Sequence, residues 1–274
     1  MVAIAQTWQF LTGDEWLGLD PQKMAVSVFA GDENASKDSE SEAIWLKQPN
    51  FPGKDRISYL DKNENWWPAG GGTGGPCGPD TETFYWVGNS EAPAKFDSND
   101  KNWVEVCNNV FIQFERLEDG TYQALKQQSV DMGMGLARVM MILQDKDNVY
   151  ATDLFAPIIE HIRANAKLQS DQNERVIADH LRAVVFLAMD GVVPSNKDQG
   201  YIMRRLLRRA IIKWQHGLKG LEKLSDEIVP TVIKIYASAY PELHASADEI
   251  IKTIEQEESK FERTLSAGLQ QVSI

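Results

Sequence analysis

The chain has 274 residues, of which 43% are hydrophobic and 25% are charged, a composition typical of a soluble globular protein with one large or two ordinary domains. Its formal net charge of −12 argues against general electrostatic attraction to nucleic acid or to anionic membranes, so any contact with nucleic acid has to be local. The two cysteines and four scattered histidines offer neither zinc-ligand spacing nor a disulfide framework.

These counts predict no metal site and a reducing, cytoplasmic location. The first residues are too polar and too short for a signal peptide, and no apolar run approaches the length of a membrane span. We therefore expect a cytoplasmic protein without a membrane partner.

Apolar periodicity predicts a helix over residues 3–11, and alternation predicts a strand over residues 24–30. The acidic segment 32–42 is interpreted as solvated surface and leads to a short helix near 43–47. Residues 63–82 combine paired tryptophans with many glycines and prolines, which predicts a long, shaped loop. A functional loop is favoured over a flexible one because the prolines stiffen it.

A β-hairpin is predicted next. Residues 102–117 form the first strand, residues 118–120 (Glu-Asp-Gly) the turn, and residues 121–125 begin the returning strand. Asn108 and Asn109 lie inside the apolar first strand. Because buried amides need several partners, either both are satisfied by the neighbouring backbone or one of them faces a polar ligand.

The returning strand leads into residues 130–143, which place an acid, two glycines and an arginine between a strand and an apolar helix. Glycines at such a turn let a ligand approach the backbone, and the helix N-terminus favours an anion. Asp131 and Arg138 would then offer opposite charges to an amino group and a phosphate. The alternative is a plain turn in which Asp131 caps the helix and Arg138 lies on the surface.

From residue 153 onward the apolar spacing is helical. Helices are predicted over residues 154–167, 174–189, 199–218, 221–240 and 246–272. The change from β-rich to all-helical sequence predicts an α+β chain with two domains, 1–152 and 153–274.

Four arginines recur at one- and four-residue spacing in one of these helices: Arg204, Arg205, Arg208 and Arg209. In an acidic protein such a stripe favours a local contact with phosphate backbone. The alternative is ion pairing with nearby acids such as Asp179, Asp190 or Asp198. Asn196, in the loop before this helix, either contacts a groove edge of nucleic acid or only forms the turn.

Motifs in the same order along nearly the whole chain resemble the class II alanyl-tRNA synthetases. They are Asn65-Trp66-Trp67, Gly75-Pro76-Cys77-Gly78-Pro79, Asn108 with residues 110–114, Val130-Asp131 with Gly133-Met134-Gly135, residues 152–155, Ala178-Asp179-His180, Pro194-Ser195-Asn196, and Gly200-Tyr201 with Arg204-Arg205. The stretch 130–143 is similar to motif 3 of that class. The resemblance implies an incomplete class II antiparallel sheet followed by an all-α domain.

The resemblance also implies site residues. An alanine pocket would be lined by Trp67, Asn108, Val110, Asp131 and Gly133, with Asp131 holding the substrate ammonium. ATP, with Mg²⁺, would contact Arg138 and Gly135. Asn196 would enter the minor groove of the alanine tRNA acceptor stem near its G·U pair, beside the arginine stripe. The family joins the alanine carboxylate to the α-phosphorus of ATP, releases pyrophosphate, and passes the alanyl group to the tRNA.

Three departures from the family pattern shape the expectation. Ala137 stands where a glutamate usually precedes the motif 3 arginine, Cys107 replaces a usual tryptophan, and motifs 1 and 2 would lie before residue 1. We therefore expect an alanine–tRNA ligase fragment that needs a second polypeptide carrying motifs 1 and 2. The alternatives are a non-catalytic module that binds the tRNA acceptor stem and an inactive remnant.

Overall fold

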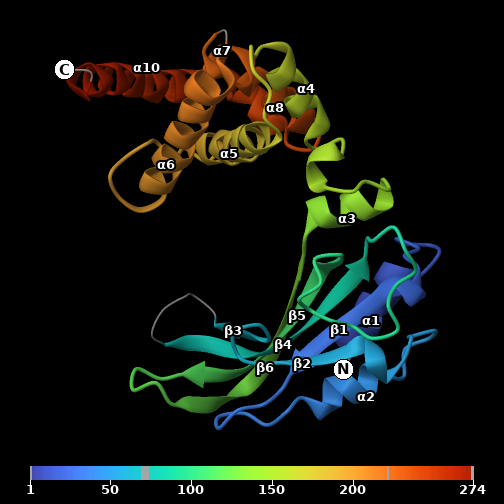
Figure 1. Cartoon of the computed structure of the whole chain (residues 1–274). Coiled ribbons are helices and arrows are strands. Elements are labelled where there is room, and N and C mark those ends of the chain that lie inside the picture. The colour runs from blue at the N-terminus through green and yellow to red at the C-terminus, as the bar shows by residue number, and fades with distance from the viewer. Residues whose placement is uncertain (1, 69–73, 221, 273–274) are drawn as a thin grey trace. The chain divides into compact units, whose positions relative to one another are not determined.

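A computed structural model describes residues 2–68, 74–220 and 222–272. The chain divides into two compact units, residues 1–147 and residues 148–274 (Figure 1). The second unit begins close to residue 152, where the change in sequence pattern lies.

The first unit is built on a six-stranded sheet with strand order β2-β1-β4-β5-β6, and β3 pairs with β4. The strands are β1 (Met24–Phe29), β2 (Ile57–Leu60), β3 (Trp66–Pro68), β4 (Gly75–Trp86), β5 (Trp103–Arg116) and β6 (Tyr122–Met134). Neighbouring strands are antiparallel except β1 and β2, which are parallel. The expected α+β class is confirmed, and the parallel β2 is a strand that the sequence pattern did not predict.

The long loop predicted for residues 63–82 is wrong in its second half, which begins β4. Trp67 of β3 pairs with Gly78 of β4, and β4 pairs with β5 on its other side. A Cβ at Gly78 would lie 1.8 Å from the carbonyl oxygen of Phe111, so glycine here permits close approach of two strands. Cys77 is buried beside Phe29 and Trp66. Residues 69–73 of the predicted loop lie outside the described residues.

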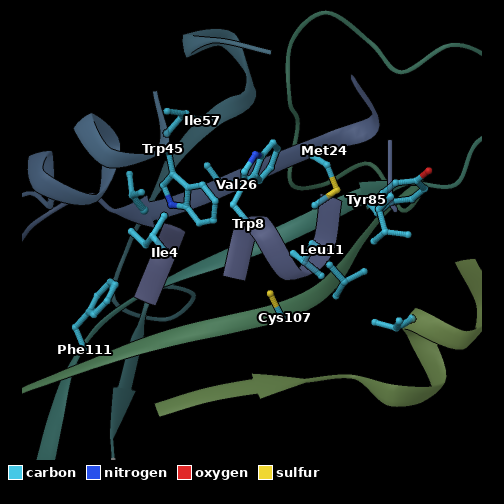
Figure 2. Packing of buried hydrophobic residues seen from close by; sticks show 14 residues of the cluster. Ile4, Trp8, Leu11, Met24, Val26, Trp45, Ile57, Tyr85, Cys107 and Phe111 are labelled. Atoms are coloured by element: carbon cyan, nitrogen blue, oxygen red, sulfur yellow. The ribbon is translucent and has the colours of Figure 1, made fainter. Parts of the chain in front are cut away.

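Two helices pack on one face of the sheet, α1 (Val2–Thr12) and α2 (Ser39–Trp45). The spacing of Ile4, Trp8 and Leu11 puts all three on the sheet-facing side of α1 (Figure 2). The rings of Trp8 and Trp45 meet edge to face with centroids 5.9 Å apart. Burial of each large apolar side chain contributes about 1.5–3 kcal/mol, so this face holds the main core of the first unit. The short helix α3 (Leu136–Leu143) follows β6.

The second unit consists of helices. They are α4 (Ala156–Ala164), α5 (Asp171–Met189), α6 (Asp198–Ile212), α7 (Leu224–Glu227), α8 (Val229–Tyr236), α9 (Pro241–Ala245) and α10 (Ala247–Val272). The apolar face of α5 contacts α4, α6, α8, α9 and α10, so α5 is the central helix. The single helix predicted over residues 221–240 is interrupted, since α7 ends at Glu227 and a new helix, α8, begins at Val229 with Pro230 in its first turn. None of the described helices is both long and apolar enough to span a membrane.

Candidate functional site

Two rows of directly opposed residues cross β4, β5 and β6. The first row is Asp80, Val110 and Asp131, and the second is Glu82, Asn108 and Gly133. Directly opposed residues of antiparallel strands point to the same face of the sheet. The structure therefore brings together four of the five residues expected to line an alanine pocket. The fifth, Trp67, lies in β3 with 40% of its surface exposed, and β4 and β5 separate it from β6.

A β-bulge determines which face Asp131 occupies. Near the hairpin turn Arg116 pairs with Tyr122, and an unchanged register would put Asp131 opposite Cys107, a residue of the core under α1. The register shifts between Ile112 and Phe114, and Asp131 pairs with Val110 instead. Because the partner changes by an odd number of residues, the carboxylate turns to the face opposite α1.

The two paired asparagines lie on opposite faces of the sheet. Asn109 is fully buried on the face that α1 covers, and its Oδ1 accepts a hydrogen bond from the Thr7 hydroxyl at 2.9 Å. Thr81, directly opposite Asn109 in β4, accepts a hydrogen bond from Nε1 of Trp45 at 2.9 Å. Asn109 is therefore structural, whereas Asn108 points to the face that carries Asp131.

A buried polar network lies beside Asn108 on that face. The Nδ2 group of Asn65 donates to Oδ1 of Asp80 at 2.9 Å and to the hydroxyl of Ser27 at 2.8 Å. That hydroxyl in turn donates to Oε2 of Glu82 at 3.2 Å. Asn65 and Ser27 are fully buried and Asp80 is 2% exposed. The network therefore fixes two carboxylates in the strand next to the predicted pocket.

Burial makes these carboxylates weak acids. Desolvation raises the pKa of Asp80 to about 6, against the lowering effect of hydrogen bonds from Asn65 and Asn108. Desolvation, with repulsion from Glu105 and Asp80, raises the pKa of Glu82 to about 8. Near neutral pH Glu82 therefore holds its proton, while Asp80 is largely ionised. With the exposed carboxylate of Asp131, the face is suited to a cationic group such as an ammonium.

Arg138 has an intramolecular partner. Its Nη1 lies 2.6 Å from Oε2 of Glu105 and donates to the Glu105 carbonyl oxygen at 3.0 Å. A Cβ at Gly135 would lie 3.1 Å from Cδ of Arg138, so glycine leaves room for the arginine to fold back toward β5. The backbone N–H of Gly135 donates to the carbonyl of Val106. The guanidinium and this N–H are thus both engaged within the first unit.

The arginines of α6 divide into two pairs. Arg208 forms an ion pair with Glu257 of α10, with Nη2 and Oε1 2.6 Å apart, and lies over the ring of Phe261. Arg204 donates a hydrogen bond to Oδ1 of Asn196. The partner of Arg208 is therefore not one of the nearby acids expected from the sequence, but a glutamate 49 positions away.

The other two arginines of the stripe are exposed. Arg205 and Arg209 are four residues apart and form no ion pair within the described parts of the chain. Asn196 is exposed in a shaped loop, where the hydroxyl of Ser195 donates to the carbonyl of Lys197 at 2.9 Å. A Cβ at Gly200 would lie 2.4 Å from that hydroxyl oxygen, so the loop packs closely on the start of α6.

The family model of class II tRNA synthetases (A) matches residues 2–273. The chain belongs to the class II tRNA synthetases. It is 39% identical to the alanine–tRNA ligase of Borrelia hermsii, over 98% of this chain and 46% of that protein. Identity is 40% with the alanine–tRNA ligase of Pediococcus pentosaceus (98% and 30%) and 38% with that of Treponema pallidum (97% and 45%). The chain spans less than half the length of these relatives.

Sequence reasoning missed part of this candidate site. Asp80, Glu82 and Asn65 belong to the stretch that was predicted to be a loop, so their common face was not considered. The sequence did contain a pattern that indicates a strand, because Asp80, Glu82 and Phe84 alternate with Thr81 and Thr83. Glu105, the partner of Arg138, had no comparable signal, since the two residues are far apart in sequence.

Proposed function

We propose that this chain supplies the later part of the catalytic domain and the helical tRNA-recognition domain of an alanine–tRNA ligase. The observation that carries the proposal is the register of β5 and β6, in which Asn108, Val110, Asp131 and Gly133 share one face. The family match and the names of the relatives support the same assignment.

In this proposal the ammonium of alanine binds the carboxylate of Asp131. Its methyl group lies against Val110, and Trp67 forms an outer wall. Gly133 leaves space for the substrate, since a Cβ there would have no other atom within 4 Å. The alanine carboxylate then bonds to the α-phosphorus of ATP as the bond to pyrophosphate breaks. Positioning and charge stabilisation accelerate such a step without a nucleophilic side chain.

ATP binding is assigned to Arg138 and Gly135. To reach a phosphate, the guanidinium of Arg138 exchanges the Glu105 carboxylate for phosphate oxygens, with which it forms comparable charge-assisted hydrogen bonds. The described residues do not gather three or more His, Cys, Asp or Glu side chains as a metal site. Mg²⁺ is assigned to the ATP phosphates.

The helical unit is proposed to bind the acceptor stem of alanine tRNA. Asn196 would enter the minor groove, with its carboxamide oriented by Arg204. Arg205 and Arg209 would contact backbone phosphates, because they are exposed and available. Arg208 is assigned an internal role through its ion pair with Glu257.

A second polypeptide carrying motifs 1 and 2 is proposed to complete the sheet. Within the described residues β6 pairs only with β5, and Val130 and Met132 are 51% and 44% exposed. A 13-residue strand with an open edge and exposed apolar side chains is suited to accept another strand.

The test is alanine-dependent exchange between ATP and pyrophosphate. We expect exchange when the chain is mixed with a fragment of a related ligase that carries motifs 1 and 2, and loss of exchange in Asp131→Asn. Absence of exchange in the mixture, with both pieces folded, would overturn the enzyme assignment.

A non-catalytic module that binds the acceptor stem is the second candidate. The ion pair between Arg138 and Glu105 favours it, because the arginine is already neutralised, and Ala137 is a further departure at the same place. Binding of an acceptor-stem duplex without exchange identifies this function. Neither binding nor exchange identifies an inactive remnant.

A further inference from the structure

The exposed row of basic side chains on α6 is longer than the two arginines assigned to phosphate above. Most of the excess acid of this chain lies in residues 1–147, so the helical unit is close to neutral as a whole. Exposed positions recur at 205, 209, 212, 216 and 219, along α6 and the π-helical segment Lys213–Leu218 that continues it. Four of these positions are basic: Arg205, Arg209, His216 and Lys219.

A second segment brings one more lysine to the end of this row. The backbone N–H of Lys167 donates to the carbonyl of Lys219 at 3.4 Å, and an antiparallel bridge joins Ala166 to Gly220 beside them. Both lysines are exposed, and neither forms an ion pair within the described parts of the chain. Two like charges thus leave the backbone at neighbouring points, which is unfavourable in the absence of an anion.

The backbone of Lys219 is unfavourable as well. Its φ of 56° and ψ of 49° lie in the left-handed region, which glycine or asparagine adopts more readily than lysine. The turn is held in place, because the N–H of Gly220 donates to the carbonyl of Trp214 at 3.0 Å and Trp214 is fully buried. Local conformations that cost stability in a well-held segment are a feature of functional sites.

The shape of the row favours a strand of phosphates as the partner. From residue 205 to residue 219 the row spans about 20 Å at the rise of an α-helix, a length that matches roughly six nucleotides of one duplex strand. Glu262 of α10 lies beside the row, where it accepts a hydrogen bond from Gln215. A plane of anionic lipid headgroups would also meet this acid, whereas a strand of phosphates meets only the row.

We propose that Lys167 and Lys219 extend the phosphate contact of Arg205 and Arg209, so that the helical unit holds the backbone of an RNA duplex over about 20 Å. That the duplex is the acceptor stem of alanine tRNA rests on the proposed function, whereas the length of the contact does not. Contacts to phosphate supply affinity and fix position without reading sequence.

The experiment measures binding of RNA hairpins to the full chain by fluorescence anisotropy at several salt concentrations. A short stem holds the G·U pair, and two longer stems extend it by about six base pairs on one side or the other. The unmodified chain should bind one of the longer stems more tightly than the short stem. Replacing both Lys167 and Lys219 by glutamine should remove this gain, about tenfold at low salt, and reduce the salt slope for that stem by about 2.

The matched control is Lys234→Gln with Lys252→Gln, which removes two exposed lysines from α8 and α10 of the same unit. This control should keep both the gain and the slope. An equal loss in the control, or a gain that persists in the Lys167 and Lys219 variant, would overturn the proposal.

Lys219→Gly separates the charge from the backbone. Because glycine tolerates the left-handed conformation, this variant should unfold at a higher urea concentration and still lose affinity for the longer stem. Lower stability with unchanged affinity would make Lys219 structural and overturn the proposal.

Two further outcomes separate this inference from the proposed function. If none of the stems binds, the RNA assignment of the helical unit and this inference both fail. If the stems bind and the Lys167 and Lys219 variant binds them equally well, this inference alone fails. Loss of binding to anionic phospholipid vesicles in that variant, with stem binding unchanged, would assign the row to a lipid surface instead.

Discussion

The strand face that carries Asp131 and the arginine stripe of α6 differ in what holds their candidate functional side chains. On the strand face, strand pairing brings distant residues together, and Asn65 and Asp80 form a buried hydrogen-bonded network beside them. In α6, helical spacing suggests one surface, but Arg208 is used internally by Glu257. Strand register can therefore bring together residues whose positions in the sequence do not suggest a common site. Conversely, contacts between helices can remove from a surface some of the residues that helical spacing places on it.

Two glycines of the sheet give the largest predicted contrast. Gly78→Ala places a Cβ 1.8 Å from a carbonyl oxygen, whereas Gly133→Ala has open space. We expect Gly78→Ala to lower the free energy of unfolding by at least about 3 kcal/mol and Gly133→Ala to change it by less than about 0.5 kcal/mol. Urea unfolding followed by tryptophan fluorescence measures both. Equal stabilities would show that β4 and β5 can separate without cost, contrary to the close packing described above.

The α6 arginines give the next contrast. Arg208→Ala leaves the Glu257 carboxylate, whose side chain is 6% exposed, without its cation, and should destabilise the second unit by roughly 2–3 kcal/mol. Arg209→Ala, one position further along the same helix, should change stability by less than about 0.5 kcal/mol. Thermal or urea unfolding decides between these outcomes. If Arg209→Ala proves the more damaging, the division of the stripe into internal and exposed pairs is wrong.

The raised pKa of Glu82 predicts a pH dependence of stability. Between its ordinary pKa of 4.5 and the folded value of about 8, the folded chain binds a proton that the unfolded chain has released. Its contribution to stability therefore falls as the pH rises through this window and is constant above it. Glu82→Gln should remove this dependence and stabilise the chain at pH 8 by roughly 1–2 kcal/mol. Denaturation midpoints of both proteins between about pH 5 and 8 provide the measurement; parallel profiles would contradict the assignment.

The smallest predicted effects concern tRNA. Replacing Arg205 and Arg209 by glutamine should weaken binding of every acceptor stem a few-fold and reduce the slope of log affinity against log salt by about 2. Asn196→Ala should leave that slope unchanged and lower discrimination for the G·U-containing stem. Fluorescence anisotropy with matched duplexes at several salt concentrations separates the two. Unchanged binding in both variants would remove the RNA assignment of the helical unit.

Sequence reasoning located the hairpin because Glu118, Asp119 and Gly120 form its turn, and it placed the helices through their apolar spacing. The loop prediction failed at β4 because the glycines and prolines of residues 75–79 were interpreted as turn and loop residues. Their use here depends on the backbone of Phe111, which approaches too closely for a side chain at Gly78. That contact is a property of the pairing and is not encoded in the local pattern.

The candidate site residues were likewise predictable only in part. The resemblance to a family indicated Asn108 and Asp131, but no local feature indicated that the register between β5 and β6 shifts by an odd number of residues. Asp80 and Glu105 were missed because their importance comes from burial and from partners elsewhere in the sheet. Long-range partners also explain why the internal role of Arg208 was not foreseen.

The bulge between β5 and β6 has a consequence for how this sequence can diverge. The turn at residues 118–120 lies beyond the bulge, so it can gain or lose residues without changing which side of the sheet Asp131 occupies. Residues 125–128, which the bulge leaves outside the paired ladder, have no such freedom. Loss of one residue there moves every later side chain of β6 to the opposite face of the sheet and turns Asp131 into the core under α1. Relatives with this site should therefore vary in length at the turn and keep the length of 125–128 constant or change it only in steps of two.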